Sequence, residues 1–320
     1  MSTCKTCRSR VAVVLDYPHA KSFYGPLVRA MRRRFNVTPI PRSRAAALQG
    51  WDLVVFPFRD WAVPGSFVVD HAPLLGNRCT LQAQDFEVWS SLGVERAAGV
   101  WGVGARVASW PIGFFFMDQL DFGTYRPDVA LAYFANREPR LDVAGTLRVL
   151  CQRFARVLYC FHVMDPGWDV PVVADNLKRV KHGPAFWAAL GQAGTVLCDY
   201  SSVVTVALGD PRKRLYSHQA MPRPGHAAAR FFNRVVQRIA YTYTEDSLGR
   251  LLDEPDTRTR VRQRWARWVH GPGLGKGATE RVVGAMEQAI RLRREGTCTG
   301  QPIRAILGGD PCKGGEHEPR

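Results

Sequence analysis

In residues 194–203, Gly-Thr-Val-Leu-Cys-Asp-Tyr-Ser-Ser-Val, an apolar run ends in an acid, an aromatic residue and two hydroxyls. Short apolar runs with polar ends are typical of buried strands, and a serine before the next apolar segment is typical of a helix N-cap. The sequence therefore predicts a strand over 195–199 and a helix over 202–208. A helix N-terminus beside hydroxyl groups can bind a phosphate, although the same spacing fits a capped helix without a ligand.

The residues before this stretch repeat the alternation of strand and helix. Strand-like runs at 129–134 and 157–162 enclose a helical pattern over 141–156. Strands that alternate with helices favour a parallel sheet, and ligands bind such sheets beyond the carboxyl ends of the strands. We expect polar residues that directly follow these strands to form any site in this half of the chain.

The first half of the chain predicts a second parallel sheet. A strand over 10–16, a helix over 22–34 and a strand over 35–40 form a β-α-β unit. Further segments of the same alternation are a short helix at 43–48 and strands at 51–56 and 66–70. The predicted fold class is α/β, with two Rossmann-like domains.

The domain boundaries follow from where these patterns change. A chain of 320 residues usually divides its buried surface between about two domains. We expect an N-terminal domain over 1–125, a second domain over 126–296 and a flexible tail over 297–320. The second domain is expected to close with two long helical patterns, 246–270 and 278–294.

The composition describes a folded and strongly basic protein. Hydrophobic residues make up 46 % of the chain, which excludes intrinsic disorder for most of it, and 44 Lys and Arg against 28 Asp and Glu give a net charge of +16. Such a charge favours a polyanionic partner, namely nucleic acid, an anionic membrane surface or a phosphate-bearing substrate, or else describes only a solvated basic surface. Arginines at 32–34 and within 258–267 are candidate phosphate contacts.

The chain contains no apolar stretch of the roughly 20 residues that a membrane helix needs, and residues 1–10 lack the apolar core typical of a secretory leader. We therefore expect a soluble, cytoplasmic protein without a transmembrane segment. The basic charge remains compatible with peripheral contact with anionic lipid.

The eight cysteines do not form a recognisable framework. They are scattered, some of them inside apolar runs, so disulfide bonds are not expected. Cys4 and Cys7 have the spacing of half a zinc site, but Cys298 and Cys312 do not complete it at a standard spacing. We predict no catalytic metal.

Several common catalytic motifs are absent from the sequence. The glycine run at 271–277 lacks the Gly-Lys-Ser/Thr ending of a phosphate loop, and no Gly-x-Gly-x-x-Gly follows a strand. No His-Glu-x-x-His or Gly-x-Ser-x-Gly occurs either. These absences argue against nicotinamide and flavin enzymes, metalloproteases and serine hydrolases.

Two histidines follow predicted strands, one in each half of the chain. His71 and His162 could therefore face one cleft between the two domains, where an imidazole suits acid–base chemistry near neutral pH. Alternatively, each is a histidine hydrogen-bonded at the end of a strand. Four other histidines are interpreted as surface or secondary residues: His182, His218, His226 and His270. Candidates for contact with an acceptor, at the ends of the first and fourth strands, are Asp16, Tyr17, His19 and Asp70.

The segment Asp199-Tyr200-Ser201-Ser202, between a strand and a helix, resembles the nucleotide-side motif of the CDP-glycerol glycerophosphotransferases. These are teichoic-acid polymerases and primases of the GT-B type, with two Rossmann-like domains facing a cleft. Other segments resemble motifs of that family in the same order: 70–74, 110–113 with 117–118, 131–137, 161–162 and 277–282. The resemblance spans about residues 66 to 285.

The resemblance implies roles for the donor-side residues. Ser201 and Ser202 would hold the pyrophosphate of the donor, with Tyr200 beside them in the same motif. Arg137 would add positive charge, and Asp199 would hold the loop or a hydroxyl of the donor. The nucleotide-activated donor is a substrate in this scheme, and neither a cofactor nor a metal is required.

The resemblance also implies catalytic roles for the two histidines. His71 would be the general base that takes the proton of the acceptor hydroxyl, and His162 would neutralise charge on the bridging phosphate. This sequence has Ala72 after the first histidine and Val163 after the second, where the family has Gly and Pro. The transferred group is therefore expected to be either glycerophosphoryl or glycosyl.

The resemblance thus implies a transferase that uses a nucleotide-activated donor and a hydroxyl of an anionic acceptor, which could be a polymer, a lipid-linked molecule or nucleic acid. One alternative is a glycosyltransferase that modifies DNA bases, which the net charge of +16 would suit. Another is a non-catalytic nucleotide- or nucleic-acid-binding protein with the same fold.

Overall fold

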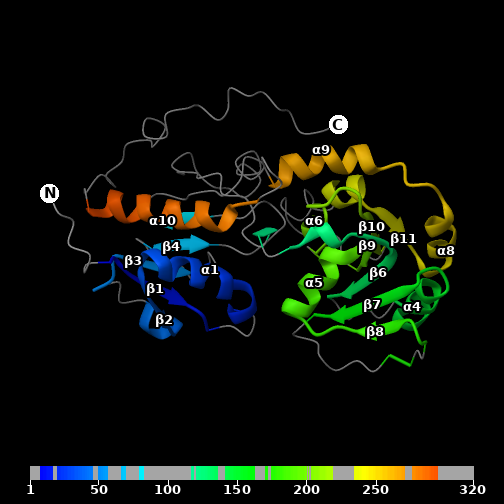
Figure 1. Ribbon diagram of the computed structural model, residues 1–320, viewed down its shortest axis with the longest axis horizontal. Coiled ribbons are helices and arrows are strands. Elements are labelled where there is room, and N and C mark those ends of the chain that lie inside the picture. The colour runs from blue at the N-terminus through cyan, green and yellow to red at the C-terminus, as the bar shows by residue number, and fades with distance from the viewer. Residues whose placement is uncertain are drawn as a thin grey trace. The chain divides into compact units, whose positions relative to one another are not determined.

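The computed structural model describes the following residues: 8–16, 20–45, 50–56, 66–69, 79–82, 117–118, 120–135, 141–162, 170–171, 174–199, 201, 203–218, 234–270 and 276–294. The chain divides into two compact units (Figure 1). Unit 1 contains Met1–Asp118 and Val269–Glu318, and unit 2 contains Gln119–Trp268 and Pro319–Arg320. The expected segmentation at residue 125 thus differs by a few residues from the division at Asp118.

Unit 1 is built on a five-stranded sheet with the order β2-β1-β3-β4-β5. Its strands are β1 (Arg10–Val14), β2 (Asn36–Ile40), β3 (Leu53–Phe56), β4 (Ser66–Val69) and β5 (Cys79–Gln82). The first four strands pair in parallel, which confirms the predicted parallel sheet, and β5 pairs antiparallel to β4. Strand β5 was not predicted from the sequence.

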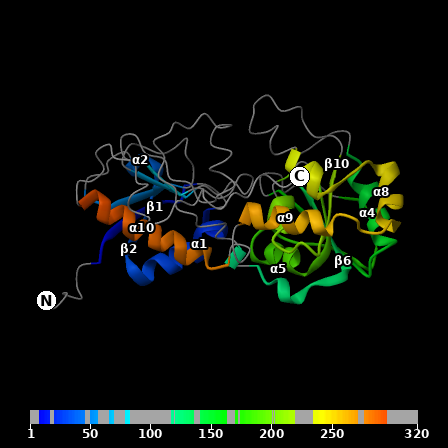
Figure 2. The same cartoon turned by 90° about the horizontal axis from the view of Figure 1, so that it is seen from above.

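The helices of unit 1 lie on the two faces of this sheet (Figure 2). Helix α1 (Ala20–Arg34) and helix α10 (Ala278–Arg294) pack side by side, and α10 also contacts β3, β4 and β5. Helix α2 (Arg42–Ala45) covers the opposite face, where Ala45 joins a core cluster with residues of β1, β2 and β3. The segment up to residue 296 was expected to belong to the second domain, whereas α10 packs in unit 1.

Unit 2 contains a six-stranded sheet with the order β11-β10-β9-β6-β7-β8. Its strands are β6 (Arg126–Phe134), β7 (Arg156–Phe161), β8 (Leu177–Arg179), β9 (Ala193–Cys198), β10 (Arg214–His218) and β11 (Tyr241–Tyr243). Every neighbouring pair is parallel, so all six carboxyl ends lie at one edge of the sheet. The three strands predicted from the sequence, β6, β7 and β9, are the central ones.

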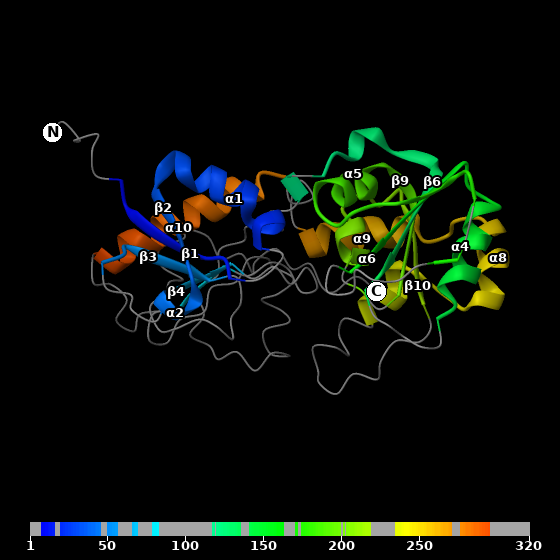
Figure 3. The same cartoon turned by 90° about the horizontal axis from the view of Figure 1, so that it is seen from below.

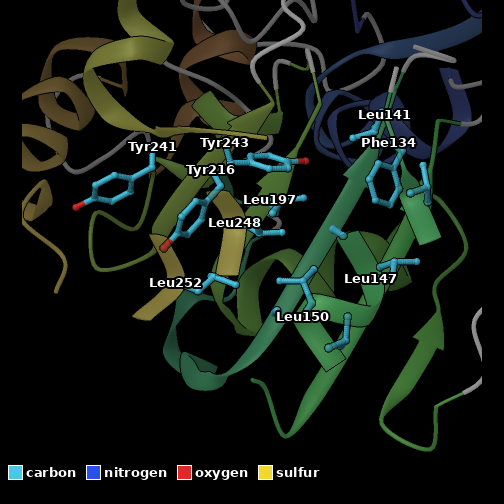
Figure 4. Packing of buried hydrophobic residues seen from close by; sticks show 14 of the residues in the cluster. Phe134, Leu141, Leu147, Leu150, Leu197, Tyr216, Tyr241, Tyr243, Leu248 and Leu252 are labelled. Carbon is cyan, nitrogen blue, oxygen red and sulfur yellow. The ribbon is translucent and has the colours of Figure 1, made fainter. Parts of the chain in front are cut away.

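Helices cover both faces of the sheet of unit 2 (Figure 3). Helices α4 (Val143–Cys151) and α8 (Glu245–Asp253) lie on one face, and α5 (Pro184–Gln192) and α6 (Val203–Ala207) lie on the other. The core under α4 and α8 includes Leu147, Leu150, Leu197 and Leu248, with three tyrosines at the β11 side (Figure 4). This double cover is typical of parallel sheets, which bury both faces.

Two predicted helices are shorter than expected. The helix predicted over 141–156 ends at Cys151, where the amide of Asn176 donates to the carbonyl oxygens of Cys151 and Phe154, each at 2.8 Å. The single helix predicted over 246–270 is two helices, α8 and α9 (Thr259–His270). Pro255 lies between them, and proline has no N–H for the helical ladder. Among the described helices, none combines the length and the apolar character that a membrane crossing needs.

Candidate functional site

The candidate site lies at the carboxyl edge of the sheet of unit 2, around the end of the central strand β6. Asp199 follows β9 directly, and its backbone N–H donates to the carbonyl oxygen of Tyr133 at 3.3 Å. The Oδ2 atom of Asp199 accepts a hydrogen bond at 2.8 Å from the backbone N–H of Ala135. Because Asp199 is only 3 % exposed, its carboxylate is held in one place beside the end of β6.

His162 lies on the other side of the same strand end. Its backbone N–H donates to the carbonyl oxygen of Phe134 at 2.8 Å, and the residue is half-buried. Asp199 and His162 therefore flank the end of β6, separated by two strand spacings, or about 10 Å. The structure brings together these two residues, both predicted from the sequence, at the edge where parallel sheets bind ligands.

Ser201, one of the two serines that the sequence offers as a helix cap, lies two residues before the start of α6. Its Oγ accepts a hydrogen bond from the backbone N–H of Val203 at 3.2 Å, at the start of α6. Helix α6 has only five residues, so its aligned peptide dipoles are few. A phosphate at this point would therefore depend on backbone N–H groups and on the hydroxyl of Ser201, which still has a proton to donate.

The acceptor-side candidates are only partly within the described residues. The carboxylate of Asp16 accepts a hydrogen bond from the backbone N–H of Arg42, the first residue of α2. Asp16 thus holds the start of a helix in unit 1. Seven predicted site residues lie outside the described residues: Tyr17, His19, Asp70, His71, Arg137, Tyr200 and Ser202.

A second cluster at this edge was not predicted as a site. The Nε2 atom of His218, at the end of β10, lies 3.2 Å from Oε1 of Glu245, and the same oxygen accepts from the backbone N–H of Asp142 at 2.9 Å. Partial burial opposes ionisation of Glu245, but hydrogen bonds from its own backbone, Asp142 and His218 outweigh that effect and lower its pKa. This carboxylate therefore links β10 to the first turns of α4 and α8.

Tyr243 adds a polar group beside this cluster. Its side chain is fully buried, its ring meets that of His218 edge-on at 5.1 Å, and among the described residues its hydroxyl has no hydrogen-bond partner. Burial, and then the neighbouring Cys198 and Asp199, raise the pKa of Tyr243 well above its usual value. The phenol is therefore neutral and can donate one hydrogen bond.

His182 was predicted as a surface or secondary residue, and not as a site residue. It follows β8 at the same edge, and its ring centre lies 6.4 Å from that of His162. The sequence offers little signal for this position, because β8 is only Leu-Lys-Arg and does not form an apolar run.

Two buried thiols close to the site are poor nucleophiles. Burial raises the pKa of Cys160 to about 12, and burial together with Asp199 raises the pKa of Cys198 well above its usual value. Both side chains are therefore neutral thiols at physiological pH. Within the described residues, no group of three or more His, Cys, Asp or Glu side chains could hold a metal ion. The zinc candidates Cys4, Cys7, Cys298 and Cys312 lie outside these residues.

Comparisons with known proteins identify the fold of this chain but do not assign it to a family. The sequence matches no family model and no curated protein. A variant of the wall teichoic acid polymerase TagF soaked with CDPG superposes with a TM-score of 0.57 at 11 % identity, covering 90 % of each chain. Another TagF structure gives a TM-score of 0.53 at 11 % identity, covering 89 % of this chain and 90 % of that one.

A third solved structure is similar in fold. The UDP-N-acetylglucosamine 2-epimerase from Rickettsia bellii has a TM-score of 0.50 at 10 % identity, covering 90 % of this chain and 99 % of that one. These likenesses confirm the predicted fold class, a mixed α/β fold with parallel sheets. The resemblance to the teichoic-acid polymerases therefore holds at the level of the fold, which this chain shares with TagF over most of its length.

Proposed function

We propose that this protein transfers a glycerophosphoryl or glycosyl group from a nucleotide-activated donor to a hydroxyl group of an anionic acceptor. The observation that carries the proposal is the placement of Asp199 and His162 on either side of the end of β6. Parallel α/β sheets bind ligands at this edge, and the fold is that of a polymerase whose variant was soaked with CDPG.

The donor would bind over β9 and β6 in unit 2. Asp199, held by Ala135, would accept a hydrogen bond from a donor hydroxyl or fix the loop that follows β9. The hydroxyl of Ser201 and the neighbouring backbone N–H groups would contact the diphosphate. The donor motif would be completed by residues that lie outside the described part of the chain: Arg137, Tyr200 and Ser202.

In the proposed reaction, the acceptor oxygen forms a bond to the transferred group as the bond between that group and the nucleotide breaks. For a glycerophosphoryl group the new bond is to phosphorus and the nucleoside monophosphate leaves. For a glycosyl group the new bond is to the anomeric carbon and the nucleoside diphosphate leaves. His71 would take the proton of the acceptor, and His162 would neutralise charge on the phosphate.

The first experiment is a thermal-shift screen with CDP, CDP-glycerol, UDP, UDP-N-acetylglucosamine, ADP and GDP. A nucleotide at about 100 times its dissociation constant adds about 2.7 kcal/mol to the stability, which moves the unfolding midpoint by several degrees. We expect one base to be selected, and Asp199→Asn and Ser201→Ala to reduce its shift. If none of these nucleotides stabilises the protein, the proposal of a nucleotide donor is wrong.

A matched control separates loss of a helix cap from loss of a ligand contact. Ser247 takes part in the capping box at the N-terminus of α8, and Ser201 likewise accepts a hydrogen bond from the first backbone N–H of α6. Ser247→Ala and Ser201→Ala should both lower the stability of the free protein by about 1 kcal/mol. Only Ser201→Ala should also weaken nucleotide binding; equal weakening by both would assign Ser201 a structural role alone.

Turnover distinguishes a transferase from a non-catalytic protein with the same fold. With the selected donor, release of nucleotide should depend on an added acceptor and fall at least about a hundredfold in His71→Ala. Nucleotide binding without turnover for any polyanionic or glycan acceptor would favour the non-catalytic alternative.

The alternative of a DNA-modifying glycosyltransferase has one supporting observation in the described residues. Helix α9 contains no acidic residue and exposes Arg260, Arg264 and Arg267 at positions that share a helix face. Binding to duplex DNA that weakens linearly with the logarithm of salt concentration, and weakens further when these arginines become glutamine, would favour DNA as the acceptor.

A further inference from the structure

The backbone on both sides of His182 fixes its position at the carboxyl edge of the sheet of unit 2. The backbone N–H of Val180 continues the pairing of β8 with β7 by donating to Tyr159 at 2.8 Å, and the chain then turns into α5 at Gly183. Gly183 has a φ of 116°, a left-handed conformation that favours glycine, and Pro184 begins the helix. The turn thus fixes the path of the chain on both sides of His182.

Aromatic side chains of α5 hold the imidazole of His182 in place. Its ring stacks on Phe186 with centres 5.3 Å apart and planes only 9° from parallel, and it meets Trp187 edge-on at 6.1 Å. Phe186 is fully buried and Trp187 is 5 % exposed, whereas His182 remains partly exposed. Stacking on an aromatic face stabilises a protonated imidazole. This environment therefore suits a positively charged His182 that is still accessible to a ligand.

The second imidazole is that of His162, and the two rings meet edge-on with centres 6.4 Å apart. Both follow neighbouring strands at the ligand-binding edge, His162 after β7 and His182 after β8. Two full positive charges at this separation disfavour each other, on the order of a hundredfold at the effective dielectric of a protein surface. In the absence of a ligand, the pair should therefore hold one proton more readily than two.

We propose that His162 and His182 form a two-imidazole clamp for the phosphate groups of the donor, and that binding draws a second proton onto the pair. The proposal rests on the proposed function and names a further residue of the same site. A phosphate oxygen between the rings would accept hydrogen bonds from both, and its negative charge would cancel their mutual repulsion. His182 then contacts the ligand directly.

Near pH 7 we expect the two imidazoles, and not the other titratable groups around them, to take up the second proton. Tyr133 in β6 and Cys160 in β7 face the pair from the sheet; burial raises the pKa of both, that of Cys160 to about 12, so both are neutral near pH 7. Asp199, at the end of β9, is a negative group on the far side of β6. Among the described residues, Lys181 is an exposed cation in the same turn as His182, and Arg179 in β8 is a second cation, whose charge acts on Cys160. Neither thiol nor phenol competes for the proton between about pH 6 and 8.

The first test measures proton uptake by calorimetry, with CDP as the probe, in two buffers of different ionisation enthalpy near pH 7. The wild type should take up a fraction of a proton on binding CDP and bind more tightly at about pH 6 than at about pH 8. His182→Gln should weaken CDP binding about tenfold or more and remove most of the proton uptake. Unchanged affinity and proton uptake in His182→Gln would overturn the clamp.

Lys181→Gln is the matched control, because it removes a positive charge from the same turn and leaves both rings in place. Its effect on CDP affinity should stay below about threefold, as expected for an exposed charge, with proton uptake unchanged. An effect as large as that of His182→Gln would assign the loss to general charge and contradict the proposal.

The second test does not depend on nucleotide binding. In the ligand-free protein, the NMR signals of the two imidazoles should titrate in two separated steps, and the titration of His162 should change when His182 is replaced by glutamine. Inorganic pyrophosphate should shift the signals of both rings. Independent titrations, or no response to pyrophosphate, would overturn the clamp; a response to pyrophosphate without binding of any nucleotide would instead overturn the proposed function.

Discussion

The carboxylate of Asp118 accepts a hydrogen bond at 2.6 Å from the backbone N–H of Gly277, and a second at 2.7 Å from Thr279. Thr279 lies in the first turn of α10, where helical N–H groups have no partner within the helix, and Gly277 directly precedes that helix. Asp118 also places a negative charge at the positive end of the helix dipole. This cap joins two segments, 117–118 and 277–282, that the sequence resemblance had identified separately.

Replacing Asp118 with alanine should therefore destabilise unit 1. Loss of a capping carboxylate that accepts two hydrogen bonds is expected to cost about 2 kcal/mol. Asp118→Asn, which retains one acceptor oxygen, should lose about half as much. Urea unfolding of both variants would measure these losses, and an Asp118→Ala protein as stable as the wild type would show that α10 does not depend on this cap.

The sequence predicted the parts of the fold that consist of long apolar runs. Strands β1, β6 and β7 each begin with an arginine and continue as a largely buried apolar run, and β9 is buried throughout, so their sequences are distinct from the surrounding loops. The outer strands β8 and β11 are three residues long, Leu-Lys-Arg and Tyr-Thr-Tyr, and carry no such signal. Strand β8 is mostly exposed at one end of the sheet, whereas β11 buries Tyr241 and Tyr243 but is too short to form an apolar run.

Site residues could be predicted from the sequence only where they directly follow an apolar strand. Asp199 and His162 follow apolar strands directly, so each could be placed at the carboxyl edge from the sequence. His182 follows the polar strand β8, and its proximity to His162 depends on a pairing of β7 with β8 that no local pattern specifies. The packing of α10 in unit 1 was missed for a related reason, since an apolar helix face does not say which sheet it covers.

Gly194 is required by a close approach of two strands. A Cβ atom at this position would lie 2.6 Å from Cα of Pro127 and 2.7 Å from the carbonyl oxygen of Arg126, both of them backbone atoms in β6. Gly194→Ala should therefore destabilise the protein by about 2 to 3 kcal/mol. Thermal or urea unfolding would measure the loss.

Gly284 provides the matched control within the same chain. It lies inside α10, and a Cβ there would meet no atom within 4 Å. Gly284→Ala should raise the stability by up to about 1 kcal/mol, because alanine favours the helix and glycine does not. Equal effects of the two substitutions would contradict the assignment of Gly194 to a steric requirement.

The buried ion pair of Arg262 and Asp256 should respond asymmetrically to substitution. Arg262 is fully buried, while the side chain of Asp256 is 18 % exposed and also accepts hydrogen bonds from Tyr241 and Thr259. Asp256→Asn leaves a buried guanidinium without its counter-ion, at a cost of about 3 to 5 kcal/mol.

Arg262→Met should cost less, because Asp256 keeps its other hydrogen bonds and part of its contact with water. Unfolding free energies of the two variants near pH 7 would compare these costs. A larger loss for Arg262→Met than for Asp256→Asn would show that packing of the arginine side chain, and not the burial of its charge, dominates at this position.

Lys213 should make the stability of the protein rise with pH in the alkaline range. Its ammonium group is buried between the carbonyl oxygens of Gly191 and Ala193, at 2.9 Å and 2.5 Å, and burial lowers its pKa to about 8. Between about pH 8 and 10, the unfolded chain keeps this proton while the native protein releases it, so the free energy of unfolding increases with pH. Removing the lysine removes that increase.

The measurement compares wild type and Lys213→Met by urea unfolding at several values between about pH 7.5 and 10, with the exposed Lys178→Met as control. Buried thiols and phenols, whose pKa values are raised, lower the stability over the same range, but they do so equally in all three proteins. The difference in unfolding free energy between wild type and Lys213→Met should therefore grow by about 2 kcal/mol across this range, in favour of the wild type. A constant difference would mean that the native protein keeps the proton on Lys213, in which case the two carbonyl oxygens compensate for its burial.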